Sequence, residues 1–115
     1  MGGKISINIE IHTYYRRLVS DLLEKSSITI NDEIQISDQI KLRYAGSYIR
    51  KGLDFPEIIY IVVSFSSGVA ASVFANWIYD KIKGKRIEKF MIEKTEIELD
   101  RGEIKRVIEE KLRIE

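Results

Sequence analysis

The residues that could do chemistry in this chain are few and lie far apart in the sequence. His12 is the only histidine, and there is no cysteine. A single imidazole could act as a general base, but the sequence pairs it with no nucleophile motif and no second imidazole for a metal ion. We therefore expect His12 to be a surface or capping residue, and we expect no catalytic residues.

Two further motifs could bind a ligand, but each has a structural explanation or lacks part of the required pattern. The segment Phe65–Gly68 could bind a phosphate if a strand turned there into a helix, but the lysine and hydroxyl of a P-loop do not follow it. Asp32, Glu33 and Asp38 could ligate a metal ion, yet they lie among turn residues, where stabilising the turn is the expected role. We therefore expect no metal site and no cofactor.

One local concentration of positive charge could contact the phosphates of a nucleic acid. Asp80 and Glu88 interrupt it, the net charge of the chain is only +1, and lysines at a helix end also suit the helix dipole. Nucleic-acid binding through this turn is therefore the second interpretation, after self-association. The residues concerned are Lys81, Lys83, Lys85, Arg86 and Lys89.

The most distinctive segment is Ile58–Tyr79, which holds no charged residue in a chain that is 32% charged. A membrane span would divide the 115 residues into two parts that are each too small for a stable core, and the segment contains several serines. Membrane association is therefore the third interpretation. The N-terminal segment alternates and is not an apolar run, so we expect no signal peptide and a cytoplasmic protein.

Pro56 and Glu57 are typical of a first helical turn, and Gly84 is typical of the position after a helix. The sequence therefore predicts one long apolar helix over residues 56–83. The alternative is a buried strand over residues 58–63 that turns near Gly68 into a shorter helix, because isoleucine, valine and tyrosine favour strands. We favour the continuous helix.

Elsewhere the patterns are clearer. Ile5–Ile11 alternates as a strand with one buried face, and helical spacing follows from Thr13, the expected N-cap. Alternation over residues 28–44 predicts a strand pair or a short meander, and residues 87–99 predict a hairpin. Asp100 is expected to begin a last helix with Glu103 as its capping-box partner.

These elements predict a single domain over residues 1–115, of the α+β class, with two layers. The expected order is β-α-β-β-α-β-β-α. The sheet is expected to be small and mostly antiparallel, with about four or five strands. Two short helices and the long apolar helix complete the prediction.

The predicted long helix is apolar on two sides, with small residues on one and large residues on the other. A small domain covers one side, and the other would form a larger apolar patch than a soluble monomer tolerates. We therefore expect a non-enzymatic interaction module that forms a homo-oligomer, most simply a dimer, through this helix. The expected interface residues are Ile58, Val62, Phe65, Val69, Val73, Asn76 and Trp77.

The second half of the chain carries an apolar centre at Gly68–Ala71, a polar exit at Asn76–Asp80, the basic turn, and a hairpin and helix over Thr95–Glu110. This pattern resembles the effector-associated constant component modules of bacterial and archaeal conflict systems. The resemblance implies a non-enzymatic module that associates with a signalling or effector protein.

Overall fold

The structure is a computed structural model that describes residues 5–50, 54–66 and 71–113. Along these residues the chain forms six strands and three helices, which confirms the α+β class. The sheet has more strands than the four or five expected. The elements are β1 (Ile5–Thr13), α1 (Leu18–Leu23), β2 (Glu33–Ser37), β3 (Ile40–Tyr48), β4 (Glu57–Phe65), α2 (Ala71–Ile82), β5 (Ile87–Ile92), β6 (Thr95–Ile97) and α3 (Arg101–Arg113).

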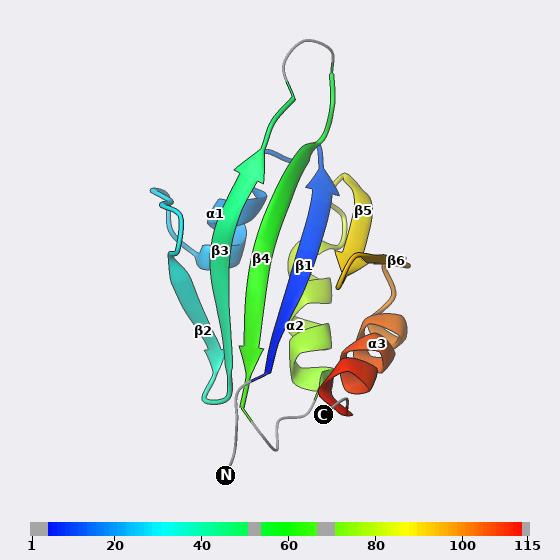
Figure 1. The fold of residues 1–115 in the computed structure, drawn as a ribbon. Helices are drawn as coiled ribbons and strands as arrows, with labels where there is room; N and C mark the ends of the chain where they lie inside the picture. The colour runs from blue at the N-terminus through cyan, green and yellow to red at the C-terminus, as the bar shows by residue number, and fades with distance from the viewer. Residues whose placement is uncertain (1–4, 51–53, 67–70, 114–115) are drawn as a thin grey trace.

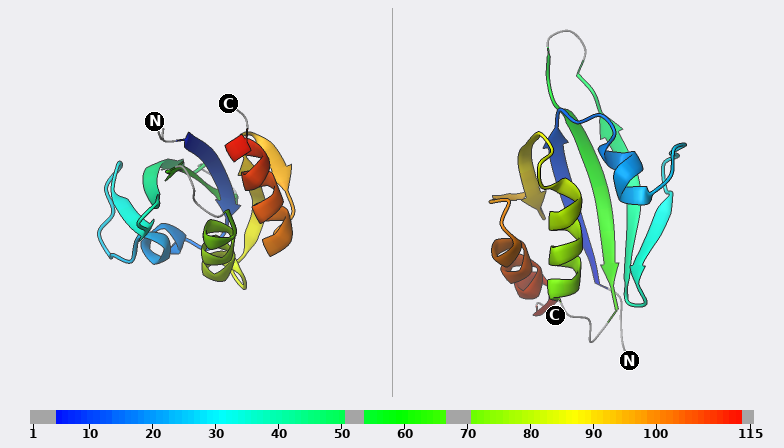
Figure 2. Two further views of the ribbon diagram at one scale, coloured as in Figure 1. Left: turned by 90° about the horizontal axis from the view of Figure 1, so that it is seen from below. Right: turned by 180° about the vertical axis from the view of Figure 1, so that it is seen from behind.

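All six strands belong to one antiparallel sheet with the order β2-β3-β4-β1-β5-β6 (Figure 1). The two central strands, β4 and β1, pair along nine residues, from Ile5 opposite Phe65 to Thr13 opposite Glu57. Helices α1 and α2 lie behind the central strands, and α3 packs alongside α2 (Figure 2). In the described residues no helix crosses the front of β3, β4 and β1 (Figure 1).

The core lies between the sheet and the helices. Strand alternation places every second side chain of β1 and β4 on this side, where all but Ile5 are buried. The apolar stripes of α1 and α2 close the core from the other side. Its members include Ile7, Ile9 and Ile11 from β1, Ile59, Ile61, Val63 and Phe65 from β4, Leu18 and Leu22 from α1, and Phe74 and Ile78 from α2.

The prediction of one helix over residues 56–83 is wrong, and the alternative of a strand followed by a helix is correct. Residues 57–65 form β4, which pairs with β1 on one side and β3 on the other. A strand with sheet neighbours on both sides and apolar residues on both faces shows no period-2 pattern, so it can be mistaken for a helix. Pro56 lies just before the first paired residue, where its missing N–H costs the sheet no hydrogen bond.

Helix α1 begins at Leu18 rather than directly after Thr13. Thr13 ends β1 instead, and its side chain is fully buried. Its hydroxyl donates to the carbonyl oxygen of Arg86 at 2.7 Å and accepts from the N–H of Tyr15 at 2.9 Å. The prediction of Thr13 as the N-cap of the helix is therefore wrong, because Arg17 holds that position. Thr13 instead caps the turn after β1 and ties β1 to the start of β5.

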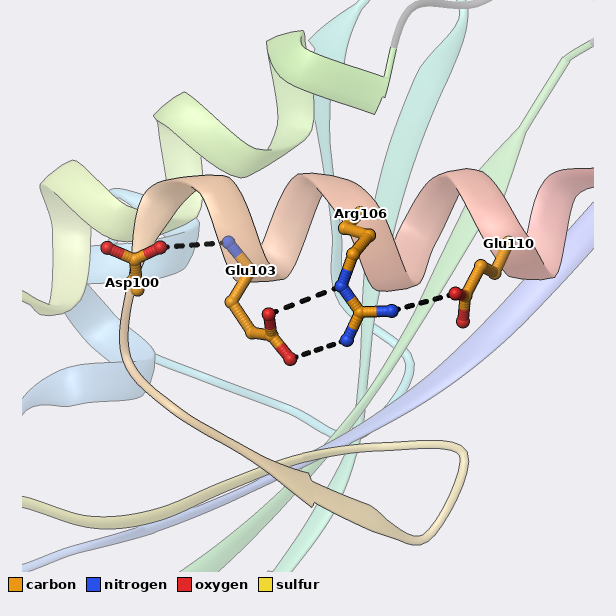
Figure 3. A network of polar contacts seen from close by, with 4 residues as sticks. All are labelled: Asp100, Glu103, Arg106 and Glu110. Carbon is orange, nitrogen blue, oxygen red and sulfur yellow. Dashed lines mark hydrogen bonds and ion pairs between the residues drawn. The ribbon is translucent and has the colours of Figure 1, made fainter.

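The C-terminal hairpin follows the prediction, and α3 begins after Asp100 as expected. Glu93 and Lys94 connect β5 to β6 with φ of 50° and 68°, the conformation of a tight two-residue hairpin turn. Asp100 accepts a hydrogen bond from the N–H of Glu103 at 3.0 Å, which caps α3 (Figure 3). Glu103 is not the capping-box partner of Asp100, because its carboxylate accepts from Arg106 at 2.6 Å and the N–H of Asp100 donates to the carbonyl oxygen of Glu98 at 2.8 Å. Arg106 also donates to Glu110 at 2.7 Å. The hydrogen bond from Arg106 lowers the pKa of Glu103.

Candidate interaction surface on the open face of the sheet

We call the surface of the sheet that faces away from α1 and α2 the open face. It begins at the centre of the sheet with β1 and β4, whose outward side chains differ in kind. On β1 they are polar, and on β4 they are mostly apolar. The outward residues are Ser6, Asn8, Glu10 and His12 on β1, and Ile58, Tyr60, Val62 and Ser64 on β4.

An antiparallel sheet with one solvated face normally presents polar side chains to water on that face. Strand β1 follows this rule, but β4 does not. Tyr60 is 41% exposed, and Ile58 and Val62 are half-buried. The middle of the open face therefore carries an apolar stripe that the described helices do not cover.

A bulge in β3 extends this stripe. Tyr44 pairs with Ile61 on the helix side of the sheet, but Gly46 already pairs with Tyr60, so one residue of β3 is extra. Gly46 has a φ of +119°, which a residue with a side chain rarely adopts. Because the extra residue reverses the alternation, Tyr48 lies on the open face opposite Ile58, and it is 56% exposed.

His12 and Glu10 are neighbours on the open face of β1. Their Nε2 and Oε2 atoms are 2.7 Å apart, so the two side chains are joined by a hydrogen bond. On the sheet, His12 lies between Ile58 of β4 and Lys89 of β5. Among the described residues, no three histidine or acidic side chains gather as a metal site would require. The geometry of His12 suits the structural role expected from the sequence.

Charged side chains flank the apolar stripe with different signs. On the β3 side, Lys41 and Arg43 lie opposite Ser64 and Val62 of β4. Lys41 is 3.6 Å from Glu33, and Arg43 donates to Asn31 at 2.8 Å, so both side chains are oriented across the strand pair. On the β1 side, the carboxylate of Glu10 stands next to Tyr60.

The residues predicted for the oligomer interface do not lie on one surface. Ile58 and Val62 are on the open face, but Phe65 is buried on the helix side in an edge-to-face contact with Phe74 at 5.7 Å. Three others belong to α2 behind the sheet, and Val69 lies outside the described residues. Those on α2 are Val73, Asn76 and Trp77. The continuous helix that would have joined all seven does not exist.

The sequence analysis missed Tyr48 and Tyr60 as surface residues. Tyr60 alternates with Ile58 and Val62, so reading residues 57–65 as a strand would have placed all three on one face. Nothing in the local sequence shows the face of Tyr48, because it depends on the bulge against β4.

The basic turn after α2 is less free than its sequence suggests, because three of its lysines form ion pairs. These are Lys81 with Glu24 at 3.1 Å, Lys83 with Asp80 at 3.6 Å and Lys85 with Asp21 at 3.7 Å. Arg86 lies over the ring of Tyr14 at 4.5 Å, and Lys89 is on β5. Two of the acids are far away in the sequence: Asp21 lies in α1 and Glu24 directly follows it. This neutralisation weakens the case for phosphate contacts, and nucleic-acid binding stays a prediction.

Two other motifs were considered as ligand sites, the acidic residues near Asp32 and the segment Phe65–Gly68. Asp32 accepts from the N–H of Thr29 at 2.8 Å and lies 3.3 Å from the Lys25 amino group. The Thr29 bond, with help from Lys25, lowers the pKa of Asp32, so this carboxylate stabilises its turn. Of the segment Phe65–Gly68, the last two residues lie outside the described residues.

No helix in the described part of the chain is both long and apolar enough to cross a membrane. Comparisons with protein-family models, with curated proteins and with solved structures found no match to this chain. The resemblance to effector-associated modules therefore stays a prediction that rests on the sequence pattern alone.

Proposed function

We propose that this protein is a small non-enzymatic interaction module that self-associates through the open face of its sheet. The observation that carries this proposal is the apolar character of both sides of β4. On the helix side, Ile59, Ile61 and Val63 are covered by the chain's own helices. On the open face, the apolar stripe and Tyr48 have no such cover among the described residues.

A second copy of the chain has the right size to cover this stripe. Nine-residue strands are about 30 Å long, and four strands from β3 to β5 span roughly 15 Å between their axes. Such a face can provide much of the roughly 800 Å² per partner that a stable interface buries. Two such sheets would pack face to face about 10 Å apart.

The charges on the open face also suit a two-fold contact. A two-fold axis that runs parallel to β4, between the two copies, places the β3 side of one copy over the β1 side of the other. Lys41 and Arg43 of each copy would then approach Glu10 of its partner, and this contact would occur twice. A rotation about an axis across the strands would place like charges together instead.

The test is the molar mass of the chain in solution, measured by size-exclusion chromatography with light scattering. We expect the wild type to have twice the chain mass of 13.4 kDa. The variant Val62→Asp puts a charge in the middle of the stripe and should have the mass of a monomer. Val73→Asp is the matched control, because Val73 is 42% exposed on α2, on the other side of the molecule.

The outcomes distinguish the open face from α2 as the interface. A dimer that Val73→Asp breaks and Val62→Asp leaves intact would place the interface on α2 and contradict the open face. A monomeric wild type at all concentrations tested would contradict self-association. Circular dichroism of both variants would confirm that each still folds.

A further inference from the structure

At one end of the open face, where β1 and β3 end and β4 begins, the surface is hollowed into a pocket of about 370 Å³. Pockets that bind small molecules have volumes of roughly 300–1,000 Å³. Most of this lining is apolar or aromatic, and one member is a guanidinium. The lining residues are His12, Tyr48, Arg50, Phe55, Pro56 and Ile58.

The floor of the pocket is one row of the sheet. Tyr48, Ile58 and His12 lie side by side on β3, β4 and β1 through direct pairing. Tyr48 reaches this row only because of the bulge at Gly46. The row therefore presents an aromatic ring, an aliphatic side chain and an imidazole on rigid strands, and strand positions hold a binding site more firmly than loops do.

The wall of the pocket is Phe55, which is fixed at two points. Its carbonyl oxygen accepts a hydrogen bond from Arg16 at 3.0 Å, and Arg16 is also 3.9 Å from Glu57. The guanidinium of Arg50 lies over the Phe55 ring, 4.6 Å from its centre. This stacking keeps the charge of Arg50 at the rim of the pocket.

The electrostatics of the pocket favour an anion. Its described lining includes the guanidinium of Arg50 and no carboxylate. Glu10, on the open face of β1, is already joined to His12 by a hydrogen bond, and Lys89 lies on the other side of His12. In the described residues Arg50 forms no ion pair, so its donors are free for a ligand.

We propose that this pocket binds a small aromatic carboxylate. Arg50 holds the carboxylate, because the planar guanidinium matches a carboxylate with two parallel hydrogen bonds. The flat body of the ligand lies against Ile58 and between the rings of Tyr48 and Phe55, where aromatic groups pack favourably. Every lining residue that the structure describes belongs to one chain, so binding at this site does not require self-association.

Three probes of one shape test the proposal: cinnamate, the uncharged cinnamamide and the cationic cinnamylammonium. Each is titrated into the isotope-labelled protein while amide resonances are followed by NMR. We expect cinnamate to shift the amides of His12, Tyr48 and Ile58. We also expect it to bind about tenfold more tightly than cinnamamide, since a hydrogen-bonded charge is worth at least that factor.

Variants assign the effect to the pocket. Arg50→Gln should remove the preference for cinnamate over cinnamamide, whereas Arg113→Gln, at the exposed end of α3, should leave it unchanged. Tyr48→Ala should weaken cinnamate and cinnamamide alike. Tyr48 and Ile58 belong to both the pocket and the apolar stripe, so a second copy on the open face would compete with the ligand. Val62→Asp, which is expected to be monomeric, should therefore bind cinnamate at least as tightly as the wild type does. Loss of binding in this monomer would contradict the pocket, whereas a change of mass alone would concern only self-association.

Equal affinity for all three probes would overturn the proposal, because it would show only adhesion to apolar surface. A preference for cinnamate that survives Arg50→Gln, or resonance shifts confined to other parts of the sheet, would overturn it as well.

Discussion

The two faces of β4 have nearly the same chemistry but different surroundings. Ile59, Ile61 and Val63 point to the helices and are at most 2% exposed, whereas Ile58, Tyr60 and Val62 point the other way and are half-buried or exposed. Strand β1, its neighbour, is apolar only toward the helices. A central strand that is apolar on both sides is typical of a sheet covered on both sides. The described residues supply no helix over the open face, and we propose that a second copy supplies this cover.

The largest expected effects are on the free energy of unfolding, and they should differ between the two faces of β4. Phe65→Ala removes a fully buried ring that contacts Phe74, and it should lower the free energy of unfolding by about 3–5 kcal/mol. Tyr60→Ala, on the open face, should cost about 1 kcal/mol at concentrations where the chain is monomeric. Urea denaturation measures both. An equal cost for the two variants under monomeric conditions would mean that the chain itself covers the open face.

Val62 and Val63 are adjacent and point to opposite faces of the sheet. The same nearly isosteric substitution can therefore be made on each face. Val63→Thr places a hydroxyl in the core and should cost about 1–3 kcal/mol. Val62→Thr makes the same change on the open face and should change the stability of the monomer by less than about 0.5 kcal/mol. Self-association should show the opposite pattern. Val62→Thr should weaken it and Val63→Thr should not, because only Val62 lies in the proposed interface. Denaturation at low concentration and light scattering across concentrations give the two readouts.

Substitutions at two glycines can distinguish an effect of the β3 bulge on the open face from a general effect of backbone strain. Gly46 and Gly84 have φ of +119° and +77°, and an added Cβ would meet nothing closer than 3.7 Å at either. Alanine at either position should therefore cost about 1–3 kcal/mol through backbone strain alone. Only Gly46→Ala should also weaken cinnamate binding, because the bulge directs Tyr48. If Gly84→Ala weakened binding equally, the effect would be one of stability and not of the bulge.

Much of the fold could be predicted because its signals are local. The alternation of Ile5–Ile11, the hairpin around Glu93 and Lys94 and the cap at Asp100 each depend on residues that are close in sequence. The segment 57–65 has no such local signal, because its apolar residues are continuous. In addition, Pro56 and Glu57 are residues typical of the first turn of a helix. What decided its structure is pairing with β1 and β3, which is not visible in a local window.

The candidate site shows the same limit. Ile58 and Val62 were identified as surface-forming residues, but on a helix and with partners that lie elsewhere. The face of Tyr48 follows from a bulge against β4, and the neutralisation of the basic turn follows from acids in α1 and directly after it. These are contacts between residues far apart in the chain, so the sequence pattern could not indicate them.

The smallest effects belong to exposed turns that neither face of the sheet buries. The hydrogen bond from Thr29, and the nearby Lys25, lower the pKa of Asp32 below its usual value of 3.8. A lowered pKa in the folded state means a contribution to stability that is present above pH 3.8 and is lost as the pH falls through the folded value. Asp32→Asn should therefore lower the melting temperature slightly at pH 7 and should differ less from the wild type at pH 2.

Lys25→Gln is the control for this turn. It removes the ion pair but keeps the hydrogen bond from Thr29, which is the larger cause of the shift, so it should preserve most of the difference between neutral and acid pH. Neither change should alter the mass in solution or the binding of cinnamate, because the turn before β2 is not part of the stripe or the pocket. An effect of Asp32→Asn on association would show that the interface reaches the β2 edge, and the comparison of the two faces of β4 would have to include it.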